Sequence, residues 1–344
     1  MQRITNELID WYQENKRDLP WRHTKNPYHI WISEIMLQQT KVEVVKEYYG
    51  RFINKLPTIK DLANSSEDEL LKLWEGLGYY TRVRNMQKAA KILVENGYDN
   101  LPNTKEELIN LPGVGKYTVG AILSIAYDIP ALAIDGNVYR VLGRVYEISK
   151  AISTPSTYKI YADILKQQLI PENASDLTQS FMDFGSLICT PKNPKCKDCP
   201  LNTKCLAYKK GTQEHFPVKQ SKRERKIEER VVFLYIYKDK VAIQKREETG
   251  LLASLYEFPN TLRPFSLIDV EINMMDRNIP YKTVSEIGEA KHVFSHIIWY
   301  MKGYEIIVKK PLKEYIWVSK EELKNEYSIP SAFAYFYDYI MNEE

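Results

Sequence analysis

The sequence has no apolar run approaching the roughly 18 residues that a membrane-spanning helix needs. Its first residues enter an amphipathic pattern with no apolar signal core, so we expect a cytosolic protein without a membrane partner. Neither sign of charge dominates, because 48 Lys and Arg residues against 45 Asp and Glu residues leave a net charge of only +3. A charge this small does not by itself indicate a polyanion partner. Disorder is excluded by a hydrophobic content of 44%.

Cysteine is missing from nearly the whole chain. All four cysteines stand between Cys189 and Cys205, separated by gaps of six, two and five residues. This crowding argues against the disulfide framework of a secreted domain. Cys196 and Cys199 form a Cys-x-x-Cys pair, and the two outer cysteines complete four soft ligands. The spacing alone predicts a metal site that holds either an iron–sulfur cluster or a tetrahedral zinc ion.

Strand patterns are missing from the first 208 residues, where apolar residues recur at helical spacing. A chain of 344 residues should hold about two domains. We predict an all-α region over 1–208, a linker over 209–228 and an α+β domain over 229–344. The linker is rich in Lys and Arg, which fits either a solvated connection or one that follows a phosphate backbone.

The α+β domain is predicted from its strand and helix patterns. Two apolar runs separated by a short polar turn predict a hairpin at 231–243. Further strands are expected at 293–308 and 315–318, followed by helices at 320–325 and 331–341.

A glycine-containing turn, Leu111-Pro112-Gly113-Val114-Gly115-Lys116-Tyr117-Thr118, precedes a helical pattern. Glycines let the backbone approach a ligand, and free N–H groups at a helix start attract phosphate oxygens. The turn therefore has the helix-hairpin-helix pattern that grips a DNA backbone without reading its sequence. A plain tight turn between two helices is the alternative. A Walker loop is excluded, because its spacing and its Lys-Ser/Thr ending are missing.

Two carboxylates are candidates for acid–base chemistry. Glu34 shares a helix face with Ile30 and Leu37, and apolar neighbours make a carboxylic acid hold its proton more tightly. Such a group suits a general acid near neutral pH, although a carboxylate at the edge of an apolar stripe is the simpler explanation. Asp135, in Asp135-Gly136-Asn137, either caps the following helix or faces a reacting sugar.

The ordered motifs together resemble the helix-hairpin-helix superfamily of iron–sulfur DNA glycosylases, and more narrowly the MutY-type adenine DNA glycosylases. The resemblance covers essentially the whole chain. It implies a multidomain fold, with an all-α helix-hairpin-helix glycosylase region and an iron–sulfur cluster loop at 189–205, followed by an α+β Nudix-like domain. The residues that carry it are Leu19-Pro20-Trp21-Arg22, Ser33-Glu34-Ile35-Met36-Leu37-Gln38-Gln39-Thr40, Gly76-Leu77-Gly78-Tyr79-Tyr80, residues 111–118, Asp135-Gly136-Asn137-Val138 and the cysteine spacing.

The resemblance implies a base excision repair enzyme that hydrolyses the N-glycosidic bond of adenine opposite 8-oxoguanine or guanine in double-stranded DNA. It implies a monomer, and it favours a [4Fe–4S] cluster over zinc on the four cysteines. Glu34 corresponds to the acid that protonates adenine and Asp135 to the carboxylate that stabilises the cationic sugar. Tyr117 and Asn137 correspond to residues that support these two carboxylates.

Further residues correspond to binding positions of that family. The pocket for the extruded adenine corresponds to Arg17, Leu19, Trp21 and Gln179. Contacts to DNA correspond to Leu37, Gln39, Tyr79, Gly113, Val114 and Gly115, of which Gln39 and Tyr79 enter the opened base stack. Recognition of 8-oxoguanine corresponds to Phe294, Ser295 and His296, for which an exposed strand with a buried Phe294 is the alternative.

Three positions depart from related patterns. Tyr117 stands where endonuclease III-type enzymes carry a Schiff-base lysine, so we expect a monofunctional glycosylase without efficient lyase activity. Tyr256 stands where tryptophan is usual in the MutY-type C-terminal domain. Residues 246–250 resemble part of a Nudix hydrolase box, but its upstream glycine and glutamate are absent, which argues against nucleotide hydrolysis.

Two other functions compete with adenine release. One is an endonuclease III-like glycosylase directed at oxidised pyrimidines or mismatched thymine, against which Tyr117 and the Nudix-like domain argue. The other is a non-catalytic sensor of DNA damage, against which the joint presence of Glu34 and Asp135 argues.

Overall fold

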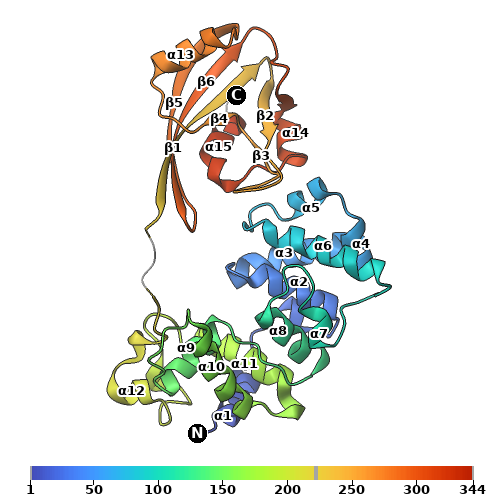
Figure 1. Cartoon of the computed structure of the whole chain (residues 1–344), viewed down its shortest axis with the longest axis vertical. Helices are drawn as coiled ribbons and strands as arrows, with labels where there is room; N and C mark the ends of the chain where they lie inside the picture. The colour runs from blue at the N-terminus through green and yellow to red at the C-terminus, as the bar shows by residue number, and fades with distance from the viewer. Residues whose placement is uncertain (1, 221–223, 343–344) are drawn as a thin grey trace. The chain divides into compact units, whose positions relative to one another are not determined.

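The computed structural model describes residues 2–220 and 224–342, which form two compact units (Figure 1). The helical unit comprises 2–65 and 81–220, and the sheet unit comprises 66–80 and 224–342. Residues 221–223, inside the predicted linker, lie outside the described residues. None of the helices in the described ranges is both long and apolar enough to cross a membrane.

The helical unit consists of short helices joined by turns, as the sequence predicted. Proline and polar caps set several boundaries; for example, Asn26 accepts a hydrogen bond from the backbone N–H of Tyr28 at the start of α2. The helices of the unit are α1 (Thr5–Asn15), η1 (Pro20–Arg22), α2 (Pro27–Leu37), α3 (Val42–Lys55), α4 (Ile59–Asn64), α6 (Thr81–Glu95), α7 (Lys105–Leu108), α8 (Lys116–Tyr127), α9 (Gly136–Val145), α10 (Pro155–Gln168), η2 (Pro171–Asn173), α11 (Ala174–Leu187), η3 (Cys196–Asp198), α12 (Leu206–Lys210) and η4 (Gln213–His215).

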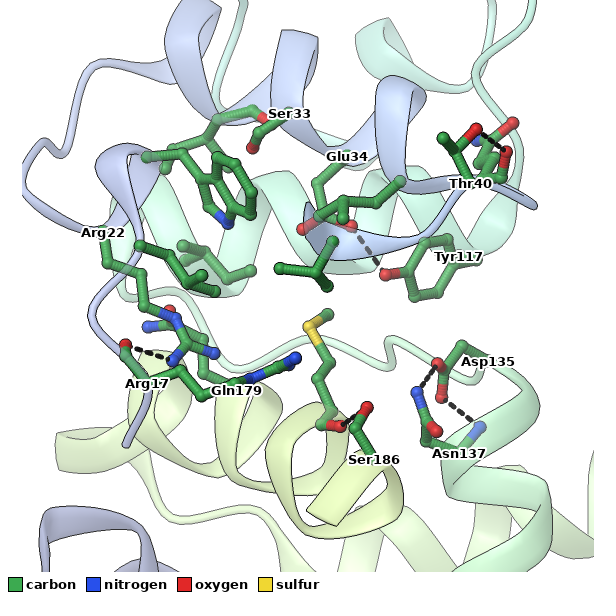
Figure 2. Close-up of a pocket in the computed structure, with 18 of the residues that line it drawn as sticks. Arg17, Arg22, Ser33, Glu34, Thr40, Tyr117, Asp135, Asn137, Gln179 and Ser186 are labelled. Atoms are coloured by element: carbon green, nitrogen blue, oxygen red, sulfur yellow. Dashed lines mark hydrogen bonds between the residues drawn. The ribbon is translucent and has the colours of Figure 1, made fainter. Parts of the chain in front are cut away.

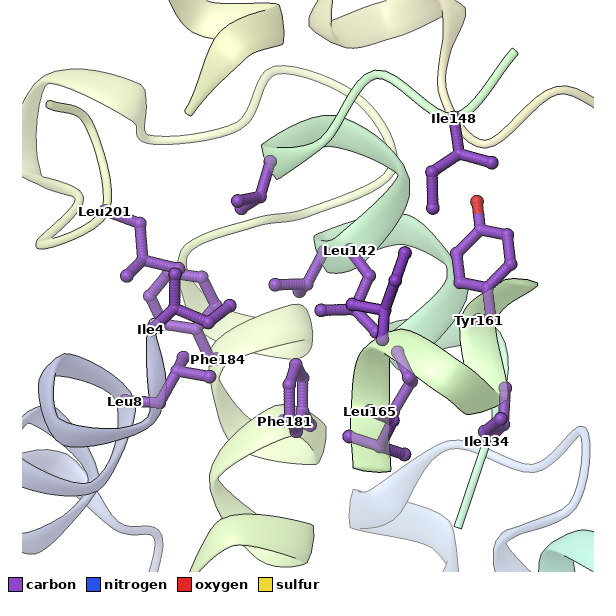
Figure 3. Close-up of a cluster of buried hydrophobic side chains, with 14 of the residues drawn as sticks. Ile4, Leu8, Ile134, Leu142, Ile148, Tyr161, Leu165, Phe181, Phe184 and Leu201 are labelled. Atoms are coloured by element: carbon purple, nitrogen blue, oxygen red, sulfur yellow. The ribbon is translucent and has the colours of Figure 1, made fainter. Parts of the chain in front are cut away.

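Helix α9 lies at the centre of an extensive apolar cluster in the helical unit (Figure 3). Its Val141 and Leu142 are fully buried against α10 and α11, and Ile4 and Leu8 close the cluster from the N-terminal side. Burial of a Val or Leu side chain stabilises a fold by about 1.5–3 kcal/mol. The packing therefore fixes the start of α9, where Asp135 is the N-cap residue.

The first part of the predicted linker folds onto the helical unit. The Arg144 guanidinium donates a hydrogen bond to the carbonyl of Gln213, and the N–H of Ile152 donates to the carbonyl of Val218. The next described strand begins at Lys226. Sequence composition gave no sign of this packing, because basic residues are equally compatible with a solvated chain.

The sheet unit is a mixed sheet in the order β3-β2-β1-β6-β5, with β4 paired to β1 and β7 paired to β2 (Figure 1). Strands β1 and β6 run parallel, and the β1–β2 hairpin has the predicted turn. The elements are α5 (Glu67–Leu73), β1 (Lys226–Tyr237), β2 (Lys240–Lys245), β3 (Tyr256–Glu257), β4 (Asn260–Thr261), α13 (Leu267–Asp276), β5 (Tyr281–Val293), β6 (Ile297–Val308), β7 (Ile316–Ser319), α14 (Lys320–Asn325), η5 (Ser331–Phe333) and α15 (Ala334–Asn342).

Alternate apolar side chains of β1 point to opposite faces of the sheet and contribute to a hydrophobic core on each face. Val231, Phe233 and Tyr235 pack with α13, whereas Val232 and Leu234 pack with η5 and α15. Successive side chains of a strand point to opposite faces, so a continuous apolar run indicates a strand buried on both sides. The strand predicted at 293–308 is confirmed over Ile297–Val308, which forms β6, whereas β5 ends at Val293 and residues 294–296 form the turn between the two strands.

Candidate active site

One cavity of about 540 Å³ in the helical unit brings together residues from six helices, η1, α2, α3, α8, α9 and α11, and the loops between them (Figure 2). Its volume is that of a typical small-molecule site. Predicted site residues that line it are Arg17, Leu19, Trp21, Glu34, Leu37, Gln39, Tyr117, Asp135, Asn137 and Gln179. All four candidate catalytic residues and all four candidate adenine-pocket residues therefore line one cavity.

Glu34 is a buried acid that accepts a hydrogen bond from a tyrosine. Its side chain lies on α2, 4% exposed, and the Tyr117 hydroxyl donates a hydrogen bond of 2.6 Å to its Oε2 (Figure 2). The pKa of Glu34 is raised to about 7, chiefly by burial; the Tyr117 hydrogen bond lowers it and the charge of Asp135 raises it. Glu34 is therefore poised to carry a proton near neutral pH.

Asp135 stands in a different environment at the N-terminus of α9. Its Oδ1 accepts the backbone N–H groups of Asn137 and Val138 at 2.9 and 2.8 Å, and its Oδ2 accepts the Asn137 amide at 2.6 Å. Burial raises the pKa of Asp135, and these three donors act against that rise by stabilising the ionised form. Asp135 thus caps the helix, which is one of the two roles that the sequence left open, and it also lines the cavity.

An ion cluster holds the segment that carries Leu19 and Trp21. Asp183 on α11 is fully buried and pairs with Arg17 at 2.6 Å and with Arg22 at 2.7 Å. Burial alone would raise the pKa of Asp183, but the two guanidinium groups hold it below its usual value. Removing one partner of a buried pair leaves an uncompensated charge, so the cluster anchors this wall of the cavity.

Arg140 connects Asn137 to the cysteine loop. Its guanidinium donates to Asn137 Oδ1 at 2.7 Å, to the carbonyl of Gly185 at 2.6 Å and to the carbonyl of Cys189 at 2.6 Å. A side chain at Gly185 would not fit, because its Cβ would lie 2.6 Å from Asn137. The position of Asn137, and through it that of Asp135, thus depends on contacts with α11 and with the loop after it.

The four cysteines line one small apolar cavity. Within 2–220 and 224–342, no group of three or more His, Cys, Asp and Glu side chains is arranged to hold a metal ion. The fit of a metal group therefore rests on the donor set and its electrostatics. Burial and the neighbouring thiols raise the pKa of Cys199 to about 12, so ionised thiols here require a positive partner. Arg144 supplies one, with an N–H that donates to Cys189 Sγ at 3.3 Å.

The hairpin residues lie outside the large cavity, on the turn between α7 and α8. Gly113 has φ +76°, and a Cβ there would lie 2.8 Å from Asn85, so glycine is required both for conformation and for space. Val114 is buried and Gly115 is the N-cap residue of α8. Tyr79 and the 294–296 turn belong to the sheet unit.

Sequence reasoning missed several residues that complete the cavity and its walls. Asp183 and Arg140 act through contacts with residues distant in the chain, and no local pattern marks either of them. Polar residues that line the cavity and were not anticipated are Arg22, Ser33, Gln38, Thr40 and Ser186. Of these, Ser33, Gln38 and Thr40 flank Glu34 within the motif that identified it.

Substituting Tyr117 by phenylalanine should move the pH dependence of the reaction. The hydroxyl favours the ionised form of Glu34, so its removal raises the pKa of Glu34 above about 7. We expect the alkaline decline in the single-turnover rate to shift upward by about one pH unit. Tyr127→Phe, on the same helix but outside the cavity, should leave the profile in place. A Tyr117→Phe profile that coincides with the wild-type profile would contradict the assignment of Glu34 as the titrating acid.

Comparisons with known proteins cover both units. A family model described as HhH-GPD superfamily base excision DNA repair protein matches residues 32–167, and one described as NUDIX domain matches residues 231–339. The chain is 37% identical to the adenine DNA glycosylase of Buchnera aphidicola subsp. Baizongia pistaciae over 88% of this chain and 86% of that protein. It is 34% identical to the adenine DNA glycosylase of Rattus norvegicus over 92% of this chain and 74% of that protein.

Solved structures resemble the helical part. A thermostable thymine-DNA glycosylase matches with a TM-score of 0.55 and 28% identity over 60% of this chain and 95% of that one. Endonuclease III in a non-covalent DNA complex matches with a TM-score of 0.52 and 25% identity over 61% and 95%. The helix-hairpin-helix fold expected for this region and the Nudix-like fold expected after it are thereby confirmed.

Proposed function

The chain belongs to the adenine DNA glycosylases, and from this premise we propose that it removes adenine mispaired with 8-oxoguanine or guanine, acting as a monomer on double-stranded DNA. The protein is a DNA N-glycosylase of base excision repair. The observation that carries the proposal is the cavity in which a buried acid, Glu34, and a helix-capping carboxylate, Asp135, meet.

Glu34 donates the proton that adenine needs in order to leave. An adenine anion is a poor leaving group, so the breaking C–N bond requires a protonated acid beside the base. With its pKa raised to about 7, Glu34 keeps a large protonated fraction at neutral pH, where an ordinary carboxyl does not. After the base has departed, the ionised Glu34 accepts a proton from the attacking water.

Asp135 stabilises the sugar as it becomes cationic. Loss of adenine leaves an oxocarbenium-like deoxyribose, which an ionised carboxylate stabilises by its charge. Asp135 has three N–H donors that favour its ionised form, whereas Glu34 has the single Tyr117 hydroxyl. Two carboxyls in unlike environments divide the roles of acid and anion.

The adenine must leave the duplex before it reaches this cavity. Extrusion costs a few kcal/mol, which side chains entering the opened stack offset. Gln39, with φ +61° at the end of α2, and the exposed Tyr79 are the proposed wedges. Trp21 and Gln179 line the cavity and offer an apolar surface and an amide to the base.

The four cysteines hold a [4Fe–4S] cluster that stabilises the 189–205 loop and takes no part in the hydrolysis. Four thiols around one cavity are the donor set that the cluster needs, and metal binding contributes directly to folding. Metal analysis of the purified protein should find iron and acid-labile sulfide in equal amounts. Cys199→Ser should lose both and unfold at a lower temperature, whereas Asn202→Ser in the same loop should retain them. A single zinc per chain would contradict the cluster.

A single-turnover assay tests the substrate. Adenine release should be fastest opposite 8-oxoguanine, slower opposite guanine and slowest opposite thymine. Because Tyr117 occupies the position of a Schiff-base lysine, the product strand should stay intact until alkali is added. Faster release of thymine or an oxidised pyrimidine would favour an endonuclease III-like enzyme, and mismatch binding without base release would favour a damage sensor.

A further inference from the structure

Residues 66–80 carry the Gly76–Tyr80 motif, yet they group with the C-terminal sheet and not with the helices on either side of them in sequence. Both ends of the segment continue along the chain into the helical unit. The segment is therefore a part of the sheet unit that the chain inserts between α4 and α6.

Local hydrogen bonding fixes the loop that presents Tyr79. The Trp74 indole N–H donates to the carbonyl of Gly78 at 3.0 Å, which closes the loop behind the fully buried Trp74. Gly76, Gly78 and Tyr79 all have positive φ, at 94°, 67° and 48°. The Tyr79 side chain is 51% exposed, a high value for so large an aromatic group.

Two charged side chains bind the segment to the backbone before η5. Glu75 Oε1 accepts the backbone N–H of Ile329 at 3.0 Å, and Lys72 Nζ donates to the carbonyl of Tyr327 at 3.0 Å. Lys72 and Glu75 also pair with each other at 2.6 Å. Hydrogen bonds between a charged group and the backbone are stronger than neutral ones, and these two both contact the three-residue stretch 327–329.

A third contact secures the other end of α5. Asp68 accepts from Lys245 on β2 at 2.9 Å and from the Tyr256 hydroxyl on β3 at 3.5 Å. Tyr256 in turn packs edge-on against Tyr327, with ring centroids 4.8 Å apart. The Asp68 pair is exposed and contributes less than the two backbone contacts.

The backbone stretch 327–329, which Lys72 and Glu75 contact, is connected through packed side chains to the 294–296 turn. Phe294 contacts Trp299 edge-on at 4.8 Å between ring centroids, and Trp299 contacts Phe333 at 6.0 Å. The N–H of Phe333 donates to the carbonyl of Pro330, next to Ile329. A continuous set of packed rings and hydrogen bonds thus joins the turn proposed to meet 8-oxoguanine to the segment that carries Tyr79.

We propose that Lys72 and Glu75 are positioning residues that couple recognition of the damaged base to the entry of Tyr79 into the base stack. The inference rests on the proposed function, because it uses 8-oxoguanine as the ligand of the 294–296 turn. When the sheet unit binds 8-oxoguanine, it places Tyr79 as well, since both belong to one packed body. When adenine is paired with guanine, the 294–296 turn has no 8-oxoguanine to bind, so the coupling does not speed the release of adenine.

Lys72→Met and Glu75→Gln in the full chain test the coupling. Single-turnover adenine release opposite 8-oxoguanine should fall about tenfold in each variant. Release opposite guanine should stay within about twofold, because the coupling contributes only when 8-oxoguanine is bound. Lys72→Arg should restore the rate. Lys302→Met, which breaks a comparable pair with Glu286 in the same unit, should change neither rate. An equal loss on both substrates would overturn the inference, since it indicates a merely structural role.

A double-mutant cycle with Tyr79→Ala separates the inference from the proposed function. If Glu75 acts through Tyr79, adding Glu75→Gln to Tyr79→Ala should cause no further loss opposite 8-oxoguanine. Fluorescence of 2-aminopurine beside the 8-oxoguanine should report less unstacking in Glu75→Gln than in wild type. Wild type without any preference for 8-oxoguanine would refute the proposed function. A wild-type preference that Tyr79→Ala removes and both Lys72→Met and Glu75→Gln retain would refute only the coupling.

Discussion

Replacing Glu34 by glutamine should lower the single-turnover rate of adenine release by about 10³–10⁴-fold, the range that a general acid contributes. Glutamine keeps the size of the side chain but has no acidic proton to give. Binding to a duplex with adenine opposite 8-oxoguanine should change little, because phosphate contacts supply most of the affinity. Glu43→Gln, an exposed glutamate on α3, is the matched control and should retain full activity. Unchanged turnover in Glu34→Gln would refute the assignment of the acid.

Glu34→Gln should also change how the free energy of unfolding depends on pH, which can be measured without substrate. Folding raises the pKa of Glu34 from 4.5 to about 7, so the folded protein holds a proton that the unfolded chain has lost between these values. The free energy of unfolding of the wild type should therefore fall by up to about 3 kcal/mol as the pH rises through that window. Glu34→Gln should lack this decline. Parallel stability curves for the two proteins between pH 5 and 8 would show that Glu34 is not buried as an acid.

Replacing Asp135 by asparagine should lower the rate by about 10²–10³-fold, the loss typical of one group that stabilises transition-state charge. Asparagine caps helices as well as aspartate does, so α9 should keep its start, and the lost hydrogen bond from the Asn137 side chain should lower the unfolding temperature only slightly. The negative charge beside the sugar is lost. The rate of Asp135→Asn should thus fall far more than its stability. If Asp135 were only a structural cap, the variant would keep its rate.

Asp61→Asn provides the comparison for Asp135. Its carboxylate accepts the backbone N–H of Thr58 at the start of α4, outside the cavity, so the exchange tests a helix-start carboxylate without the proposed chemistry. Activity should remain at the wild-type level. If Asp135→Asn also retains its rate, the stabilisation of the sugar must come from another group.

Sequence patterns were sufficient for the features that neighbouring residues determine. The helices of the first 208 residues follow from apolar spacing, the hairpin turn from its glycines, and the β1–β2 hairpin from two apolar runs around a polar turn. The candidates Glu34, Tyr117 and Asp135 were predicted from the short ordered motifs in which they lie. The strand expected at 293–308 was right for β6, but β5 before it was missed, because its residues are exposed or half-buried and carry no strong apolar alternation.

Tertiary structure decided what depends on residues far apart in the chain. The amino-acid sequence placed Glu34 on an apolar helix face, but the rise of its pKa to about 7 comes from burial and from its contacts with Tyr117 and Asp135. Asp183 and Arg140 have no local signature, since the partners of Asp183 and two of the carbonyls that Arg140 binds, at Gly185 and Cys189, lie on other elements. The assignment of 66–80 to the sheet unit is also decided only by contacts such as that between Glu75 and Ile329. Spacing along a chain fixes which face a side chain takes, whereas desolvation and charge pairing arise only when distant segments pack together.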